Sequence, residues 1–228
     1  MKFVMTQSLC AEGLALLDQA HVDYISADDG DPNHYPQLMQ DADALSVRES
    51  VALPLNLEMG NTPEMVDFAL RLKPDYICMV PEKREEITTE GGLDAVFHEK
   101  ELAPTMARMA DNGIQVSLFI DPEAAQVEAA ARLGAPMIEL HTGCFANHSG
   151  KERAAELARL KRAAELAHSL GIQVNAGHGI NYQNLEQLLA GVPYLHELNI
   201  GHTIVSRALF VGMEQAVREM RQAIDRLN

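Results

Sequence analysis

The feature of this sequence that most constrains its fold is a repeated alternation of short apolar runs with longer stretches of helical periodicity. The apolar runs have the length of β-strands, and the later ones are apolar on both faces, as buried parallel strands are. Because helical stretches separate the runs, the strands are expected to lie parallel in a sheet that helices cover. The predicted strands are residues 2–5, 22–26, 44–47, 54–59, 76–80, 114–120, 136–140, 172–176 and 197–200.

Residues typical of helix ends mark several of the intervening helices. Thr62 is a favourable N-cap, and Pro63 suits the first position of a helix. Asp121 before Pro122 is interpreted in the same way, as the N-cap of a helix that Gly134 ends. Two further amphipathic helices are predicted over residues 151–170 and 212–227.

Two architectures fit this order of elements. One is a (β/α)₈ barrel, which takes about 250 residues, and the other is an open doubly wound sheet. Polar residues follow nearly every later strand, and barrel enzymes build their active sites at that end of the strands, so the barrel is favoured. No linker or shift in composition divides the 228 residues, and a single domain over residues 1–228 is therefore expected.

Composition narrows the class of protein and its partners. The chain is 47% hydrophobic and 22% charged, has no apolar run of membrane-spanning length, and begins without a signal-peptide pattern. Its three cysteines lie far apart, which is typical of a cytoplasmic protein. A formal net charge of −15 argues against nucleic acid and anionic membranes as partners. A phosphate site would have to be built locally, from backbone N–H groups and helix N-termini.

Carboxylates, histidines and glycines gather at the ends of the predicted strands. A single glutamate at such a place is more often solvated, and a single histidine in a turn is more often structural. Here several fall on neighbouring strands, and in a barrel they would converge on one mouth. The residues at these ends are Glu58, Glu139, His141, Asn175, His178 between Gly177 and Gly179, Asn199, Gly201 and His202.

These residue types predict acid–base chemistry beside a phosphate site. Glu58 and His178 are candidates for general base and general acid, provided that burial raises the pKa of the glutamate toward neutrality. Glycines at 177, 179 and 201 would let the backbone turn sharply and approach a ligand closely. No spacing such as H-E-x-x-H occurs, so the sequence predicts no metal site.

From about residue 54 to the C-terminus, the chain resembles the pyridoxine 5′-phosphate synthase family. The resemblance implies a (β/α)₈ barrel with extra helices, usually assembled as a homo-octamer, with no metal or organic cofactor. It also implies a condensation of 3-amino-2-oxopropyl phosphate with 1-deoxy-D-xylulose 5-phosphate, which yields pyridoxine 5′-phosphate, inorganic phosphate and water. The matching segments are NLEM (56–59), VPEKREEITTEGGLD (80–94), GIQVSLFID (113–121), IELHTG (138–143), VNAGHG (174–179) and HELNIGH (196–202).

The resemblance also implies roles for individual residues. Glu58 matches a proton acceptor, His178 the proton donor and Glu139 a group that stabilises the transition state. Arg48, which follows a predicted strand, is a further candidate for binding phosphate. The positions that match substrate-binding residues of the family are Thr88, Gly179, Gly201 and His202.

The first quarter of the chain departs from this family. Residues 1–48 lack the family's Asn-x-Asp-His motif and the histidine that ends its second strand. They are weakly similar to the start of the substrate domain of D-2-hydroxyacid dehydrogenases. This similarity predicts a chimera, in which a flavodoxin-like segment at 1–48 adds a ninth strand to a barrel at 54–228. The alternative function is then a catalytically impaired barrel that still binds phosphate.

Overall fold

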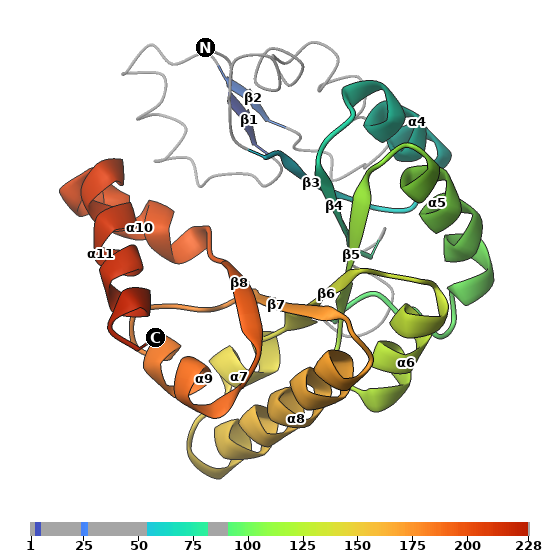
Figure 1. Cartoon of the computed structure of the whole chain (residues 1–228). Coiled ribbons are helices and arrows are strands. Elements are labelled where there is room, and N and C mark those ends of the chain that lie inside the picture. The colour runs from blue at the N-terminus through green and yellow to red at the C-terminus, as the bar shows by residue number, and fades with distance from the viewer. Residues whose placement is uncertain (1–2, 6–23, 27–53, 82–90, 228) are drawn as a thin grey trace.

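The computed structural model describes residues 3–5, 24–26, 54–81 and 91–227. The predicted strand at 44–47 and the candidate residues Arg48 and Thr88 lie outside these ranges. The described strands form two parallel sheets, shown in Figure 1. In the smaller sheet, β1 (Phe3–Met5) pairs with β2 (Tyr24–Ser26).

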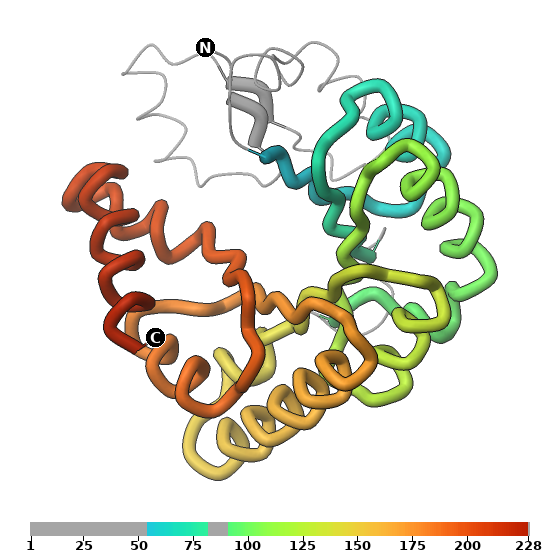
Figure 2. The backbone as a smooth tube through the Cα atoms, viewed as in Figure 1, coloured from blue at the N-terminus to red at the C-terminus, as the bar shows by residue number. Residues whose placement is uncertain are grey.

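The larger sheet holds six parallel strands whose order in space is their order in the sequence. It curls into an arc with helices along its outer side, as Figure 2 shows, and so forms a half-barrel. The α/β class and the parallel strands are thereby confirmed, while closure into eight strands stays a prediction. The strands are β3 (Asn56–Met59), β4 (Tyr76–Met79), β5 (Gln115–Ile120), β6 (Met137–His141), β7 (Gln173–Gly177) and β8 (Leu195–Asn199).

Helices connect these strands and cover their outer face. Within the described ranges, no helix is both long enough and apolar enough to span a membrane. The helices are α4 (Pro63–Leu72), α5 (Glu99–Asp111), α6 (Ala124–Arg132), α7 (Gly143–Asn147), α8 (Gly150–Ser169), α9 (Leu185–Gly191), α10 (His202–Val211) and α11 (Met213–Asp225).

Most of the predicted helix ends are confirmed. Thr62 Oγ1 accepts the backbone N–H of Met65 at 3.2 Å, and Pro63 is the first residue of α4. The helices predicted at 151–170 and 212–227 are α8 and α11. The prediction for Asp121 is wrong, because α6 begins at Ala124 with Glu123 in the N-cap position. The carboxylate of Asp121 binds other groups instead, which are described below.

Alternation along the strands gives the curled sheet two different faces. Side chains such as Ile77, Leu118 and Ile138 are fully buried in the hydrophobic core beneath the helices. The residues that alternate with these along each strand face inward. The parallel register places two of them, Glu58 and Cys78, side by side. The inner face is therefore polar, and it brings titratable side chains together near the carboxyl ends of the strands.

Candidate active site

A buried carboxyl group, that of Glu139 on β6, lies at the centre of the inner face. Its Oε2 atom accepts hydrogen bonds from Cys78 Sγ at 3.3 Å and from Asn199 Nδ2 at 2.5 Å. The three residues come from β4, β6 and β8, so side chains of three strands meet at one carboxyl group. Burial raises the pKa of Glu139, although the two hydrogen bonds lower it, and the charges of Glu58 and Glu197 raise it further. Glu139 thus keeps its proton to a higher pH than an ordinary glutamic acid.

Gly177 on β7 provides the space for this contact. It lies between His141 on β6 and Asn199 on β8 in the parallel register. A Cβ atom on Gly177 would lie 1.8 Å from Glu139 Oε1 and 3.2 Å from Asn199 Cβ. The sequence suggested that this glycine lets a ligand approach. In the structure, it is the Glu139 carboxyl group that lies directly against the Gly177 backbone.

The turn after β7 presents the His178 side chain at the end of the strand. His178 and Gly179 have φ angles of 77° and 75°, and a side-chain-bearing residue rarely adopts such a value. The Thr142 hydroxyl lies 2.6 Å from the carbonyl oxygen of Gly177 and 2.5 Å from that of His178, so it donates to one of them at a time. This local framework holds an exposed imidazole at the mouth of the half-barrel.

A second imidazole, that of His141, lies beside the first. Its ring centroid is 5.2 Å from that of His178, with an angle of 61° between the rings. His141 Nδ1 is 3.0 Å from Asp121 Oδ1, which also accepts the N–H of Gly92 at 3.1 Å. Burial raises the pKa of Asp121, but the hydrogen bonds from His141 and Gly92 outweigh that effect, and the net change is a lower pKa. Asp121 is accordingly an ionised carboxylate at neutral pH.

The structure brings some of the predicted site residues together and separates others. Glu139 and His178 lie near one another, linked through Gly177 and His141. Glu58 is exposed at the end of β3, so the burial expected for a general base at this position is not found. The buried carboxyl group is Glu139 instead. Gly201 and His202 are exposed at the start of α10, which follows β8 directly.

Sequence reasoning missed Cys78, placed Asn199 at a strand end without a role, and misassigned Asp121 as an N-cap. Burial raises the pKa of the Cys78 thiol, and the adjacent Glu139 raises it further, so the thiol stays protonated and donates to Glu139. Strand alternation could have revealed this residue, because Cys78 shares the inner face with Glu58. Asp121 also directly follows a predicted strand, at 114–120, but its Asp-Pro context is typical of a helix start as well, and the N-cap interpretation was preferred.

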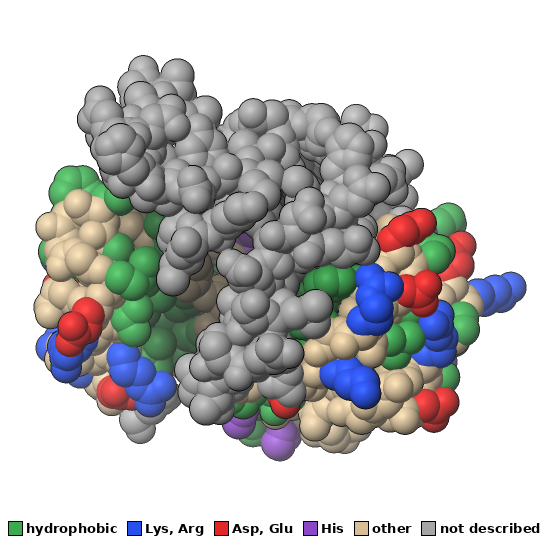
Figure 3. Space-filling view, turned by 90° about the horizontal axis from the view of Figure 1, so that it is seen from above, with side chains coloured by type: hydrophobic (Ala, Val, Ile, Leu, Met, Phe, Trp, Pro, Cys, Tyr) green, Lys and Arg blue, Asp and Glu red, His purple; other side chains and the backbone are tan. Residues whose placement is uncertain are grey.

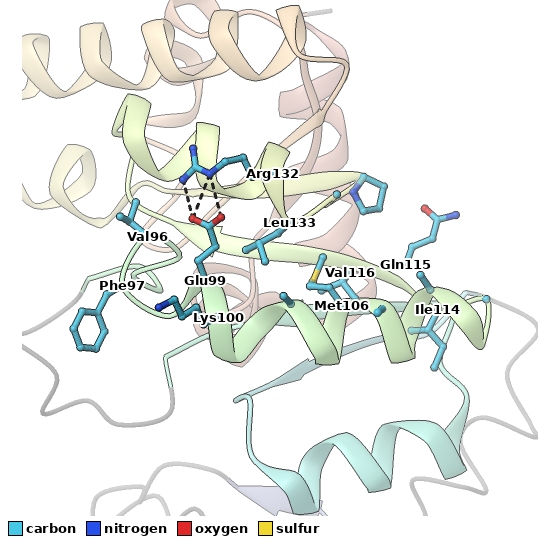
Figure 4. Close-up of a pocket in the computed structure, with 16 residues that line it drawn as sticks. Val96, Phe97, Glu99, Lys100, Met106, Ile114, Gln115, Val116, Arg132 and Leu133 are labelled. Carbon is cyan, nitrogen blue, oxygen red and sulfur yellow. Dashed lines mark hydrogen bonds and ion pairs between the residues drawn. The ribbon is translucent and has the colours of Figure 1, made fainter.

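A groove elsewhere on the molecule does not belong to this site. It has a volume of about 1130 Å³ and runs along α5 on the outer side of the sheet, as Figure 4 shows. Glu99 and Arg132 form an ion pair across it at 2.9 Å. Among the residues that the structure describes, no group of three His, Cys, Asp or Glu side chains is placed to hold a metal ion.

Comparison with known proteins identifies the family. Residues 32–226 match the family described as "Pyridoxal phosphate biosynthesis protein PdxJ". The chain is 94% identical to a pyridoxine 5′-phosphate synthase of Akkermansia muciniphila over 199 residues, which cover 87% of this chain and 79% of that protein. It is 49% identical to the enzyme of that name from Idiomarina loihiensis, over 82% of this chain and 77% of that protein. A structural comparison matches a xylose isomerase domain protein of Planctomyces limnophilus over 75% of this chain and 71% of that chain. The TM-score of 0.48 and the sequence identity of 14% are too low to assign a fold.

The comparisons give no support to a chimera. The family match begins at residue 32, inside the segment 1–48 that the sequence analysis set apart. A pyridoxine 5′-phosphate synthase of Thioalkalivibrio sulfidiphilus, 45% identical, aligns over 94% of this chain and 86% of its own length, so similarity reaches into residues 1–31 as well. The chain belongs to the pyridoxine 5′-phosphate synthase family of vitamin B6 biosynthesis.

Proposed function

We propose that this chain catalyses the reaction of its family, the condensation of 3-amino-2-oxopropyl phosphate with 1-deoxy-D-xylulose 5-phosphate. The products are pyridoxine 5′-phosphate, inorganic phosphate and water. Beyond family membership, one structural observation supports this proposal. A buried carboxyl group with a raised pKa lies near an exposed imidazole at the carboxyl ends of parallel strands, where barrel enzymes carry out their chemistry.

A condensation that closes a ring requires repeated proton transfer, and the inner face offers groups for each role. His178, exposed at the turn after β7, is the proposed proton donor. Glu58, exposed at the end of β3, is the proposed proton acceptor. Glu139 is the proposed stabiliser of the transition state, because a buried carboxyl group interacts strongly with charge that develops nearby.

The phosphate groups of the substrates require local donors on a chain of net charge −15. Gly179 lies in the left-handed turn beside His178, and Gly201 and His202 lie at the N-terminal end of α10. Backbone N–H groups at such places bind anions. We infer that Gly179, Gly201 and His202 bind substrate phosphate and inorganic phosphate. Thr88 and Arg48 remain candidates for the same role.

We also infer that the half-barrel is part of a closed (β/α)₈ barrel.

We infer further that the chain assembles as a homo-oligomer. Apolar side chains on α10 and α11 support assembly, since Leu209 is 83% exposed and Phe210 is 84% exposed. Figure 3 shows hydrophobic side chains gathered on the side of the molecule where these helices lie. Large apolar patches of this kind commonly mark protein contacts. Further members of the patch are Val205, Met213 and Val217.

The proposed reaction is tested by incubating the purified chain with both substrates and measuring pyridoxine 5′-phosphate. His178→Asn is the informative variant, because asparagine tolerates a positive φ but does not transfer protons at neutral pH. Loss of a positioned acid–base group lowers the rate by about 10²–10⁴-fold. His196→Asn, at an exposed position near the other end of β8, is the control and should keep full activity.

Absence of product would contradict the proposed reaction. If that inactive protein still melted cooperatively, and phosphate raised its melting temperature, the chain would be a barrel that binds phosphate without turnover. The two outcomes therefore separate the enzyme from the alternative function.

A further inference from the structure

We propose that Asp121 and His141 form a positioning pair that holds the His178 imidazole in its working orientation. The inference rests on the proposed function, in which His178 is the proton donor. It assigns a role to two side chains of the inner face that do not themselves transfer protons to the substrate.

The first step is the contact between the pair. Asp121 Oδ1 lies 3.0 Å from His141 Nδ1, and an ionised carboxylate can only accept hydrogen bonds. The proton of His141 must therefore lie on Nδ1, which leaves Nε2 on the side away from Asp121. A carboxylate that orients an imidazole in this way is a common second partner of functional histidines.

The carboxylate is itself anchored. The N–H of Gly92 donates to the same Asp121 oxygen at 3.1 Å. A Cβ atom at position 92 would lie 2.5 Å from the backbone nitrogen of Asp121, so the two segments are in close contact. The charged group that acts on Asp121 from a neighbouring helix is Arg159 of α8, which is paired with Glu123 and Glu156. Asp121 thus has a fixed place from which to hold His141.

The His141 ring is enclosed on several sides. Only 2% of its side chain is exposed, and the ring of Phe119 packs against it with a centroid distance of 5.1 Å. A Cβ atom on Gly143 would lie 2.4 Å from His141 Nε2 and 3.1 Å from His178 Cδ2. Both imidazoles therefore occupy the space above Gly143. His141 is held in place by its neighbours, and the exposed His178 ring packs against it.

The test compares kinetics of Asp121→Asn, His141→Phe and the double variant. Asparagine keeps the shape of Asp121 and loses its charge, while phenylalanine keeps a ring at 141 and loses the hydrogen bond to Asp121. Loss of a partner that orients a functional histidine lowers activity by about 10–100-fold. We expect each single variant to lower kcat by this factor with KM little changed. The double variant should be no slower than the slower single variant, because the residues act as a unit.

Asp75→Asn is the matched control. Asp75 Oδ2 accepts the N–H of Leu55 at 2.8 Å, near the opposite ends of β3 and β4. This variant should lower stability without changing kcat. If Asp121→Asn lowered stability in the same way and left kcat unchanged, the pair would be structural and the proposal would be overturned.

A crystal structure of Asp121→Asn gives a readout that does not depend on activity. We expect the His178 ring to leave its 5.2 Å contact with His141 or to occupy more than one rotamer. An unchanged His178 in that structure would overturn the positioning role, even for a protein that forms no product. Failure of the wild-type chain to form product would count instead against the proposed reaction.

Discussion

At the scale of single residues, the site depends on the buried carboxyl group of Glu139 and on the glycine, Gly177, that leaves room for it. Glu139 is 6% exposed, and the Gly177 backbone lies against it. Neither feature follows from the sequence alone. Glu58 and Glu139 both end predicted strands, but Glu58 lies on β3 at one edge of the larger sheet, whereas Glu139 lies on β6 between two neighbouring strands. The burial on which the general-base role of Glu58 was made conditional is therefore not found, whereas the strand-end position of Glu139 was predicted.

The raised pKa of Glu139 predicts how stability depends on pH. Because burial raises this pKa above 4.5, the folded chain retains a proton that the unfolded chain releases as the pH increases. The contribution of Glu139 to stability is therefore lost as the pH rises through this range. Glu139→Gln, which stays neutral, should unfold at higher urea concentration than the wild type at neutral pH, with a smaller difference below pH 4.5. Urea unfolding at both pH values measures this.

The control for this prediction is Glu99→Gln. Its hydrogen bonds with Arg132 lower the pKa of Glu99, so the effect of pH on stability has the opposite sign. The wild type should become more stable relative to Glu99→Gln as the pH rises. A stabilising effect of Glu139→Gln that grew toward acid pH would contradict the prediction for Glu139.

Gly177→Ala should disrupt the same contact by steric means. The added Cβ atom would lie 1.8 Å from Glu139 Oε1, so the carboxyl group or β7 must move. We expect a loss of about 1–3 kcal/mol in the free energy of unfolding, as for other overpacked sites, together with reduced activity. Gly91→Ala is the control, because its nearest atom would lie at 3.7 Å. Equal unfolding curves for Gly177→Ala and the wild type would contradict the steric role of Gly177.

At the scale of secondary structure, α7 shapes the mouth of the half-barrel from one side. Arg153 Nε donates to the carbonyl oxygen of His148 at 2.8 Å and to that of Phe145 at 3.2 Å. These bonds satisfy carbonyl groups at the end of the short helix. On its other side, Ala146 would lie 2.5 Å from a Cβ atom on Gly179. Arg153 therefore supports a helix that packs against the turn carrying His178.

Arg153→Met should loosen α7 while keeping most of the apolar side chain. Hydrogen bonds to a charged group contribute about 1.5–3 kcal/mol, and a loss of this order is expected in the free energy of unfolding, with a lower kcat. Chemical denaturation and the product assay measure the two effects. Arg153 lies on α8, and Arg162→Met, at an exposed position on that helix, should change neither the stability nor kcat. If both variants behaved alike, the support of α7 by Arg153 would be disproved.

Secondary structure was predictable where local signals agree. Thr62 and Pro63 mark the start of α4, and the periodic residues of α8 and α11 predicted those helices within a few positions. The sequence analysis did not single out α5, which has an N-cap without a side-chain hydrogen bond and a proline inside the helix. Short α7 and α9 have too few residues for a periodic pattern. Tertiary packing, rather than local preference, determines such elements.

At the scale of the whole molecule, the parallel order of the strands was predictable because helices separate them. The six described strands of the larger sheet follow one another in space as they do in sequence. The missing family motifs of residues 1–48, together with their weak similarity to D-2-hydroxyacid dehydrogenases, predicted a chimera. Sequence relatives that align over most of the chain corrected this. Closure of the barrel and assembly of the chain remain proposals.

Assembly through α10 and α11 is tested by placing charge on their apolar patch. Phe210→Glu combined with Leu209→Glu should lower the assembled mass, because both side chains are more than four-fifths exposed in the single chain. Sedimentation equilibrium measures the mass. Phe97→Glu is the control, since Phe97 is 78% exposed but lies beside α5, and it should leave the mass unchanged. An unchanged mass in the double variant would show that the contact lies elsewhere.

The most direct test of the proposed active site is turnover by the wild type and Glu139→Gln, measured side by side with both phosphorylated substrates. The wild type should release pyridoxine 5′-phosphate and inorganic phosphate in equal amounts. Glu139→Gln should be slower by about 10²-fold or more, as expected when a buried group that stabilises the transition state is lost. Glu99→Gln, on the outer face, should match the wild type. Full activity of Glu139→Gln would contradict the central role of the buried carboxyl group.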